Sequence, residues 1–403
     1  MHLRLLIYHY IFAIMTTEDA DTDAASKHVL QQLSDTAYAC SSLSPLSSRP
    51  GNFVYRGVLV HPLYVKDEAP IRTVIIKHCT TSTSEDVPNH VARRVDGPNF
   101  EELLLNSIAH FSPLTDPSIL IKVPRLRLLD EASNIQVLED FIGTTGLKSM
   151  LLSAEASNLL PSSLETIGFA LGAWIRAFHM WAAAPEQVAL RAQMWQSDPM
   201  RKTKYLFTYH GFLKVLEMHP EVLEGHRETL EEIRDTISKE YERPSTEDDE
   251  DLGLIHGDFW SGNILLPATP WREPPLSDVP NKLFIIDWEF AQFGHRSNDI
   301  GQLIGDLYER KLYGNVETVA PVMEGVIRGY GELSEQMAFR VAIYVGVHLI
   351  GWYNRRPRKG PKVVPPHVIL EGLTIGRDFI IKGWEKDRKY FENSALVSLF
   401  RRA

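Results

Sequence analysis

Short apolar runs separated by polar turns dominate the first third of the chain. Four such runs cover residues 52–60, 72–79, 123–130 and 134–141. They are rich in β-branched and aromatic residues and are bounded by Pro, Asn or Gly, which is typical of β-strands. Between the two pairs, residues 100–111 place Leu104, Ile108 and Phe111 at helical spacing. We therefore predict two strand pairs with one helix between them.

The pattern becomes mainly helical after Gly143. Residues 164–181 and 228–241 repeat apolar side chains every three to four positions. His179 lies in the first of these segments and is interpreted as a packed residue rather than a catalytic one. Two short runs, NILL at 263–266 and KLFIID at 282–287, interrupt the helices and predict a hairpin.

These patterns predict an α+β fold with two lobes. The expected N-terminal lobe covers residues 26–141, with an antiparallel sheet and one helix, and the larger helical lobe covers residues 142–403. Residues 1–25 are expected to be a disordered or leader segment. They contain the apolar stretch LRLLIYHYIFAI at 3–14, which is far shorter than the roughly 20 residues of a membrane span. Both a true leader and an upstream start before Met15 agree with this pattern, and we expect no stable membrane association.

Composition narrows the class of protein. The formal net charge of −10 disfavours a nucleic-acid partner, because phosphates would repel an acidic chain. Cys40 and Cys79 are the two cysteines, too few for a disulfide framework or a four-thiolate zinc site. They fit the reducing cytoplasm. The pattern leaves the oligomeric state open.

The stretch LIHGDFWSGNILL, residues 254–266, carries the candidate chemistry. Asp258 and Asn263 are separated by four residues, and Asp287 ends the next predicted strand. If the two strands pair, Asn263 and Asp287 converge, and an amide and a carboxylate oxygen suit Mg²⁺. Asp258 is then free to accept a proton from a substrate hydroxyl. The D-x-x-x-x-N spacing is that of the kinase catalytic loop, so the sequence predicts phosphoryl transfer.

An early lysine and an acidic partner complete this pattern. VIIK places Lys77 near the end of an apolar strand, much like the kinase V-A-I-K, where the lysine holds the phosphates of ATP. Its partner is Glu101 or Glu102 on the following helix. We favour Glu101, because it shares a helix face with Leu105 and Ile108.

Two further segments are expected to contact the nucleotide. The sequence RPGNFVYRG offers a weak glycine-rich loop, with Gly51, Asn52 and Gly57, to cover the phosphates. The adenine is expected at the lobe junction, against the backbone of residues 138–141, which include Glu139 and Phe141.

The motifs HGDFWSGNILL and FIIDWEFAQFGHRSNDIGQLIGDLY resemble the aminoglycoside phosphotransferase and choline kinase-like superfamily. DWEFAQFG, DIG and GNFVYRG are most similar to its methylthioribose kinase branch and fungal relatives, and the likeness covers roughly residues 26–390. It implies a bilobal protein-kinase-like fold that uses ATP and Mg²⁺ to phosphorylate a small molecule.

The resemblance also implies roles for individual residues. Asp258 would be the catalytic base, and His256 would support its loop. Asn263 and Asp287 would bind Mg²⁺, and Asp299 would brace the loop from the following helix. It further implies that Lys77, paired with Glu101, contacts the ATP phosphates, and that Glu289 reaches a second metal or the substrate.

Two alternatives stay open beside a small-molecule hydroxyl kinase. A catalytically silent, nucleotide-binding or scaffold relative would be expected to lose one of Lys77, Asp258, Asn263 or Asp287, and all four are present. A protein kinase is less favoured, because His256-Gly257-Asp258 replaces H-R-D, Asp287-Trp288-Glu289 replaces D-F-G, and no A-P-E-like anchor follows. The acceptor class also stays open among thio-sugars, aminoglycosides, amino alcohols and hydroxylated secondary metabolites.

Overall fold

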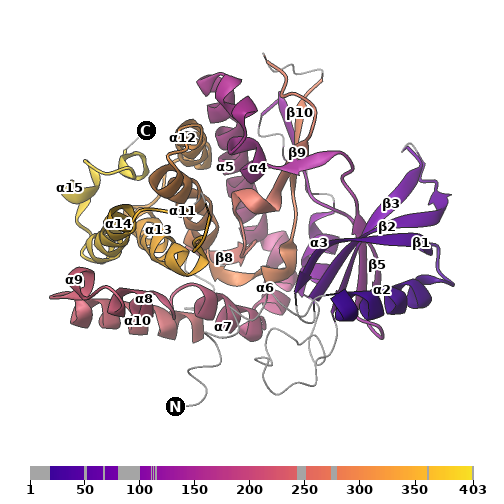
Figure 1. Cartoon of the computed structure of the whole chain (residues 1–403), viewed down its shortest axis with the longest axis horizontal. Helices are drawn as coiled ribbons and strands as arrows, with labels where there is room; N and C mark the ends of the chain where they lie inside the picture. Colours follow the sequence, from indigo (N-terminus) through magenta and orange to yellow (C-terminus); the bar gives the residue numbers. More distant parts are fainter. Residues whose placement is uncertain are drawn as a thin grey trace. The chain divides into compact units, whose positions relative to one another are not determined.

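The computed structural model describes residues 19–49, 52–66, 69–79, 100–109, 111, 113, 116–242, 251–273, 279–360 and 363–401 (Figure 1). The predicted leader at 3–14 and Gly51 lie outside these residues. The chain divides into two compact units, Met1–Ala109 with Val123–Ile142, and His110–Lys122 with Gly143–Ala403. Residues 110–122, which the sequence suggested for the first lobe, group with the second unit because β4 (Ile119–Lys122) pairs in parallel with β10 (Asn281–Ile285).

An antiparallel sheet in the order β1-β2-β3-β6-β5 forms the centre of the first unit. Its elements are α2 (Asp19–Leu33), β1 (Cys40–Arg49), β2 (Asn52–Leu63), β3 (Ile71–Cys79), α3 (Phe100–Ile108), β5 (Leu126–Asp130) and β6 (Ile135–Glu139). The two predicted strand pairs and the predicted helix are therefore confirmed.

Helix α2 covers one face of this sheet (Figure 1). Ala25, Val29 and Leu33 recur every four residues and are buried against β2 side chains such as Phe53 and Tyr55. Each large apolar side chain buried in this way contributes about 1.5–3 kcal/mol. The helix begins at Asp19, several residues inside the segment expected to be disordered. The packing of its apolar residues stabilises it, and its acid-rich start is compatible with a helix N-terminus.

The sequence did not predict strand β1. Its sequence CSSLSPLSSR has few apolar residues, and its one neighbour is β2, so it lies at the sheet edge. The β1–β2 register shifts between Pro45 and Ser47, and an edge position with an irregularity is where a strand tolerates proline. An edge strand of this composition gives little alternating signal.

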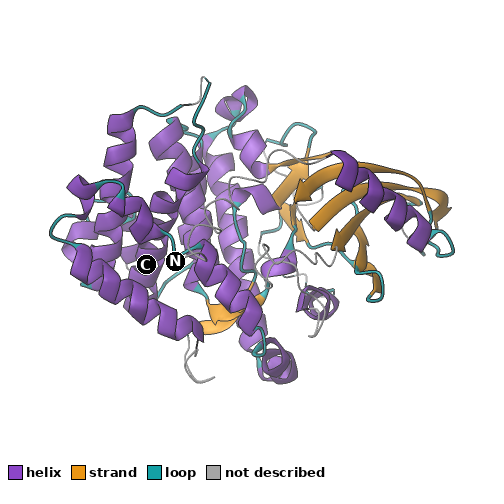
Figure 2. Cartoon of the chain, turned by 60° about the horizontal axis from the view of Figure 1, so that its bottom comes forward, coloured by secondary structure: helices purple, strands orange, loops and turns teal. Residues whose placement is uncertain are grey.

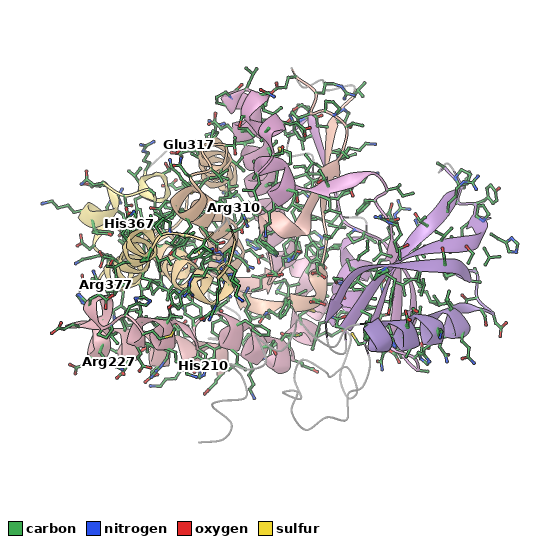
Figure 3. All side chains as sticks on the ribbon, in the orientation of Figure 1. His210, Arg227, Arg310, Glu317, His367 and Arg377 are labelled. Carbon is green, nitrogen blue, oxygen red and sulfur yellow. The ribbon has the colours of Figure 1, made fainter. Side chains whose placement is uncertain are left out.

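The second unit is mainly helical (Figure 2). Its α-helices are α4 (Leu147–Leu151), α5 (Pro161–Ala183), α6 (Val188–Met194), α7 (Asp198–Phe207), α8 (Phe212–Glu217), α9 (Pro220–Leu223), α10 (Arg227–Glu242), α11 (Ser297–Gly314), α12 (Val319–Tyr330), α13 (Glu335–Arg355), α14 (Pro366–Trp384) and α15 (Arg388–Phe391). Side chains fill the space between these helices (Figure 3). None of the described helices is both long and apolar enough to cross a membrane.

Two small sheets carry the segments of interest within this unit. One has the order β4-β10-β9-β7, with β7 at Thr144–Gly146 and β9 at Ile264–Pro267. The other pairs β8 (Leu252–Ile255) with β11 (Gln292–His295). Strands β9 and β10 form the predicted hairpin. The observed architecture is thus the expected α+β fold.

Helices α5 and α12 pack against each other through glycines. Four residues make this glycine contact, namely Gly168 and Gly172 on α5 and Gly325 and Gly329 on α12. A Cβ atom on any of them would lie 2.0–2.1 Å from a backbone carbonyl oxygen of the facing helix. The two backbones therefore touch directly, with no side chain between them at these positions.

Candidate active site

The loop between β8 and β9 holds Asp258 and Asn263. Strand β9 pairs with β10 so that Ile264 lies opposite Ile285, and the Ile286 N–H donates to the Asn263 carbonyl oxygen at 3.0 Å. Because Asn263 immediately precedes β9 and Asp287 follows β10, this register brings both residues to one end of the hairpin.

Both carboxylate oxygens of Asp258 accept hydrogen bonds. The Asn263 amide nitrogen donates to Oδ2 at 2.8 Å and to the Asp258 carbonyl at 2.9 Å. The Trp260 indole also donates to Oδ2, at 3.2 Å, and the Gln302 amide donates to Oδ1 at 2.5 Å. Asp258 is nevertheless only partly buried. The carboxylate is thus held in one orientation in a residue that is partly exposed.

Gln302 links Asp258 to a buried cation that the sequence analysis missed. The Lys204 ammonium, on α7, donates to Gln302 Oε1 at 2.6 Å. Burial lowers the pKa of Lys204, and the charge of Asp258 opposes that shift. The sequence held one usable signal, because Gln302 lies one helical turn after Asp299 on α11. The sequence gave no such signal for Lys204, because this residue lies in a largely polar helix.

Asp299 fastens the start of the catalytic loop. Its carboxylate accepts the backbone N–H groups of His256 at 2.8 Å and of Gly257 at 2.9 Å. Gly257 has φ +80°, and a Cβ there would lie 2.0 Å from the Phe290 carbonyl oxygen, so only glycine fits this turn. The resemblance implied such a brace, and these are the contacts that Asp299 makes.

His179 is the third partner of Asp299. Its Nε2 lies 3.1 Å from Asp299 Oδ2, and its Nδ1 lies 3.0 Å from the Tyr330 hydroxyl. Burial lowers the pKa of His179, so the neutral ring donates through Nε2 and accepts from Tyr330. Burial alone would raise the pKa of Asp299, but the hydrogen bond from His179 and the loop N–H outweigh it and lower that pKa. His179 is packed, as expected, and also supports the brace.

The His256 ring connects the loop to the residue that follows β10 through hydrogen bonds on both ring nitrogens. Its Nδ1 accepts the Asp258 N–H at 3.2 Å, and its Nε2 donates to the Ile286 carbonyl at 3.0 Å. The ring lies 4.3 Å from that of Trp288, and burial lowers the pKa of His256. Since backbone groups use both ring nitrogens, His256 positions the loop and does not itself face a substrate.

Asp287 has an unusual backbone conformation. Its φ of 68° and ψ of 62° are left-handed, which costs a non-glycine residue of order 1 kcal/mol and is most common at functional sites. Trp288, just after it, is buried and donates its indole N–H to the Ile285 carbonyl at 3.2 Å. Glu289 follows and is partly buried. The anchored Trp288 holds this turn in place.

The donor set at the hairpin end suits Mg²⁺. The Asn263 amide nitrogen is bonded to Asp258, which leaves its carbonyl oxygen for a metal, and Asp287 offers a carboxylate. Mg²⁺ prefers such oxygen donors and needs only one or two from the protein when phosphates complete its shell. The residues therefore fit the ion.

A second group of metal-type ligands lies on α11 and α13. It comprises Asp306, Glu309 and His348. Arg310, labelled in Figure 3, pairs with Asp306, and Arg355 donates to Glu309 at 2.7 Å. These guanidinium groups already neutralise the carboxylates, so the group is an ion-pair network rather than a metal site. Asp306 also accepts the Ser261 hydroxyl and so ties the catalytic loop to α11.

Lys77 and Glu101 form an ion pair in the first unit. Lys77 Nζ lies 2.7 Å from Glu101 Oε1, and the two residues are only 6% and 2% exposed. Between the two candidate partners of Lys77, the structure pairs it with Glu101. Glu102 is partly exposed, and burial together with the charge of Glu131 raises its pKa.

The other residues suggested for the nucleotide lie in strands or at strand ends. Asn52 begins β2, opposite Arg49 and Cys79. Gly57, in contrast, lies inside β2, so it is not part of a loop. It faces Cys40 and Ile76, where a Cβ would be 2.6 and 2.8 Å from their side chains.

Strand β6 ends among the residues expected near the adenine. Glu139 is its last residue and its N–H donates to the Arg125 carbonyl at 2.9 Å, while Phe141 is partly buried just beyond. The sequence analysis missed Asp140 between them, which accepts from Arg56 at 2.8 Å and from Thr73 at 2.7 Å. These bonds fix the end of β6.

Two fungal proteins are similar to this chain in sequence. The phosphotransferase FrzJ of Cladobotryum sp. is 28% identical over 402 residues, which cover 96% of this chain and 100% of that protein. The 4-hydroxytryptamine kinase of Psilocybe cubensis is 27% identical over 101 residues, 25% of this chain and 27% of that protein.

Solved structures with some likeness include small-molecule kinases. The ADP-bound aminoglycoside phosphotransferase APH(2'')-Ib is 13% identical with a TM-score of 0.45, and covers 90% of this chain and 99% of its own. Amicoumacin kinase hAmiN is 12% identical with a TM-score of 0.47, over 90% of this chain and 96% of its own. These scores are too low to carry the assignment, which rests on the sequence family.

The sequence model described as the phosphotransferase enzyme family matches residues 91–340, more than half of the chain. That match includes the catalytic loop, the turn at Asp287 and the brace at Asp299. This chain therefore belongs to the phosphotransferase enzyme family.

Proposed function

We propose that this protein transfers the γ-phosphate of ATP, in the presence of Mg²⁺, to a hydroxyl group of a small molecule. The observation that carries the proposal is the environment of Asp258. Three side chains orient its carboxylate, yet it stays partly accessible beside the oxygen donors of Asn263 and Asp287. This is the arrangement that a catalytic base for phosphoryl transfer requires.

Asp258 orients the acceptor hydroxyl and takes up its proton. The hydroxyl oxygen forms a bond to the γ-phosphorus while the bond to the β,γ-bridging oxygen breaks, and ADP leaves. Lys77, held by Glu101, is proposed to bind the ATP phosphates. Asn263 and Asp287 would hold Mg²⁺, which when bound neutralises charge on the phosphate oxygens. Asp299, His179 and His256 keep Asp258 in place.

The hydroxyl acceptor is supported by the relatives. Two fungal relatives are named a phosphotransferase and a 4-hydroxytryptamine kinase. We place the reaction in the cytoplasm, because neither Cys40 nor Cys79 forms a disulfide, which fits a reducing compartment that contains ATP.

The test is the Asp258→Asn variant. A panel of thio-sugars, aminoglycosides, amino alcohols and hydroxylated amines is incubated with γ-labelled ATP to find an acceptor for the wild type. The variant should then lose about 10²–10⁴-fold in kcat, the range for a lost general base, and keep its affinity for ATP. Turnover within threefold of the wild type would contradict the proposed role of Asp258.

A catalytically silent nucleotide-binding protein is the competing function. A thermal-shift assay with ATP, with and without Mg²⁺, tests it together with the panel. A ligand at about 100 times its Kd stabilises the folded state by about 2.7 kcal/mol. Mg²⁺-dependent stabilisation by ATP with phosphorylation of an acceptor supports the kinase, whereas no Mg²⁺-dependent stabilisation and no labelled product supports the silent protein.

A further inference from the structure

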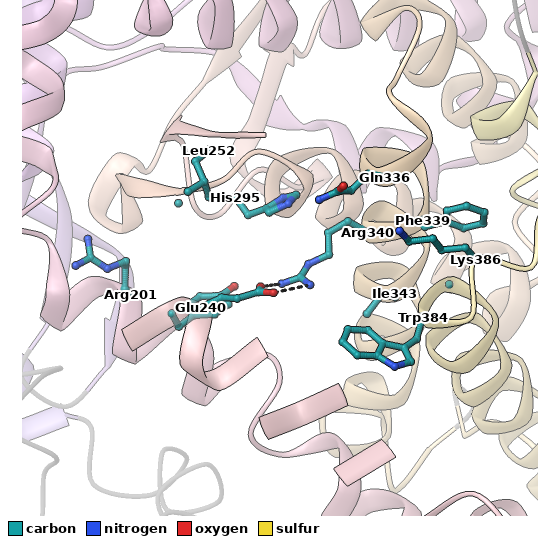
Figure 4. Close-up of a pocket in the computed structure, with 13 residues that line it drawn as sticks. Arg201, Glu240, Leu252, His295, Gln336, Phe339, Arg340, Ile343, Trp384 and Lys386 are labelled. Carbon is teal, nitrogen blue, oxygen red and sulfur yellow. Dashed lines mark hydrogen bonds and ion pairs between the residues drawn. The ribbon is translucent and has the colours of Figure 1, made fainter. Parts of the chain in front are cut away.

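The second unit contains a cavity of about 550 Å³ that the proposed reaction does not use (Figure 4). Residues of α7, α10, β8, β11, α13 and the end of α14 line it. Small-molecule pockets span about 300–1,000 Å³, so the cavity has room for a ligand. Its chemistry can be derived from the charged, polar and apolar groups that face it.

Positive charge predominates in the cavity. Arg340 and Lys386 contribute cations, and Glu240 is the acid among the lining residues. The Arg201 guanidinium instead bonds the Trp195 carbonyl and the Ser197 hydroxyl. Arg340 meets Glu240 across the cavity in a two-pronged ion pair (Figure 4). The lining thus has an excess of positive charge after that pair is formed, which favours an anionic ligand.

Arg340 also has a donor that is not used. Its Nε is buried and has no hydrogen-bond partner among the described residues. A buried N–H of this kind costs about 1–3 kcal/mol when it lacks an acceptor, so native structures usually satisfy it. An oxygen of an anionic ligand would supply both the acceptor and the countercharge.

His295 provides a second donor. Its Nδ1 accepts the Ser297 N–H at 3.2 Å, so the neutral ring carries its proton on Nε2. Burial, together with Arg340 and Arg296, holds the pKa of His295 well below its usual value, which keeps the ring neutral. Figure 4 shows the His295 imidazole facing Gln336, whose side chain adds a further amide.

The remaining wall is apolar, and its partly exposed aromatic residue is Trp384, whereas the Phe339 ring packs against Phe391 and Phe400. Phe339, Ile343 and Trp384 line it from α13 and the end of α14 (Figure 4). Aromatic walls favour a planar, apolar ligand body. Polar donors and an aromatic wall in one cavity are the usual composition of a small-molecule site.

The cavity is separate from the catalytic loop. It touches Leu252 and His295, which pair at one end of the β8–β11 ribbon, whereas Ile255 at the other end leads into His256. Three residues of strand at about 3.3 Å each put roughly 10 Å between these ends. Asp258, Asn263 and Asp287 are not among the lining residues.

A second cavity of about 530 Å³ is less suited to binding an anion. It also contains arginines, but Arg176 donates to the Tyr330 carbonyl, and Arg191 donates to the carbonyls of Ala182 and Ala184. Two of the three arginines that line this second cavity thus serve the backbone, whereas Arg340 bonds a carboxylate and has a buried Nε with no hydrogen-bond partner among the described residues.

From these features we infer that the cavity around Arg340 is a second small-molecule site, for an organic anion with a flat apolar body, such as an aromatic carboxylate. The carboxylate would accept from Arg340 and His295, and the ring system would lie along Trp384. This site does not include Asp258, Asn263 or Asp287.

The test uses calorimetry on the full chain, with 2-naphthoate as the probe and its neutral amide, 2-naphthamide, as the matched control. We expect saturable 1:1 binding of the carboxylate, at least about tenfold tighter than the amide, because an ionised group strengthens its hydrogen bonds. Arg340→Met should weaken the affinity for 2-naphthoate by about tenfold or more. Lys386→Gln, which removes a cation at the exposed rim, should weaken it by a few-fold. Asp258→Asn and saturating Mg-ATP should leave the affinity unchanged.

Several outcomes would overturn the inference. They are the absence of saturable binding at millimolar 2-naphthoate, equal affinity for the amide, no loss of affinity in either cavity variant, and displacement of the probe by Mg-ATP. If Arg340→Met does not fold, Lys386→Gln and the amide comparison decide the question. This assay measures binding and not phosphorylation. A negative binding result would therefore not argue against the proposed kinase activity, and a failed phosphorylation assay would not argue against this binding site.

Discussion

Replacing Asp299 by Asn tests whether the brace supports the catalytic loop. The carboxylate accepts the N–H groups of His256 and Gly257, and lies 3.1 Å from His179 Nε2. Asparagine has the same shape but lacks the charge and carries one amide nitrogen in place of an oxygen. In either orientation, that nitrogen faces a donor N–H, so one buried donor loses its acceptor.

The magnitude follows from these contacts. A hydrogen bond to a charged group contributes about 1.5–3 kcal/mol, and a buried N–H left without an acceptor costs about 1–3 kcal/mol. Together they predict a loss of about 2.5–6 kcal/mol, a large part of the 5–15 kcal/mol by which domains are usually stable. For a domain of this size we expect Tm to fall by at least about 5 °C.

Activity should fall by a route that stability alone does not explain. The two N–H groups belong to the residues immediately before Asp258, so a displaced loop misplaces the proposed base. We expect kcat to drop by about 10²-fold at a temperature where the variant is fully folded, with KM for ATP changed by less than about threefold. Scanning calorimetry and steady-state kinetics measure the two effects separately.

Glu317→Gln is the matched control. Glu317 is also an acid near α11, but it is 69% exposed and lies 3.6 Å from Lys311. An exposed pair contributes at most about 1 kcal/mol, so Tm and kcat should stay near the wild-type values. If Asp299→Asn behaved like this control, with Tm within 2 °C and kcat within about twofold, the argument for the brace would be refuted.

Three further predictions concern other contacts. Gln302→Leu removes a bond to Asp258 and an acceptor from Lys204, and should lower kcat about 10- to 100-fold in steady-state assays without changing KM for ATP; an unchanged kcat would contradict the orienting role. Lys77→Met should weaken the affinity for ATP at least tenfold in calorimetry, because Glu101 loses its partner and the phosphates lose a cation. Glu102→Gln should change this affinity less than twofold. Equal effects of the two variants would argue against the observed pairing. Stability should fall between pH 7 and pH 5, because burial lowers the folded-state pKa of four histidines: His78, His179, His256 and His295. Below 6.5 the unfolded chain binds more protons than the folded one, so each contributes up to about 1.4 kcal/mol of destabilisation per pH unit, visible as a falling Tm; a Tm that stays constant or rises would contradict it.

The fold was predictable where an element buries one face locally. Strands β2, β3, β5 and β6 and helix α3 show clear apolar periodicity, because each has buried neighbours within its own unit. Strand β1 lies at an edge and shows none. The placement of residues 110–122 was also unpredictable, since β4 pairs with β10 about 160 residues later, and short-range patterns do not encode such distant partners.

The candidate site follows the same rule. Asp258, Asn263 and Asp287 lie on one hairpin, so their spacing carries information about their geometry. Lys204 and His179 come from distant helices, and their contacts with Gln302 and Asp299 become visible only once the helices pack. In isolation, each looks like an ordinary helix residue.

The glycine contact between α5 and α12 has a consequence for engineering. His179 on α5 and Tyr330 on α12 form the outer part of the brace, and the direct contact of the two backbones sets the spacing between them. Ordinary cores absorb a new methyl group by shifting a neighbouring side chain, but here the neighbour is a carbonyl oxygen that cannot rotate away. Randomised libraries aimed at new acceptors should therefore keep the four glycines fixed. Diversity is better placed on helices whose contacts are made by side chains that can repack.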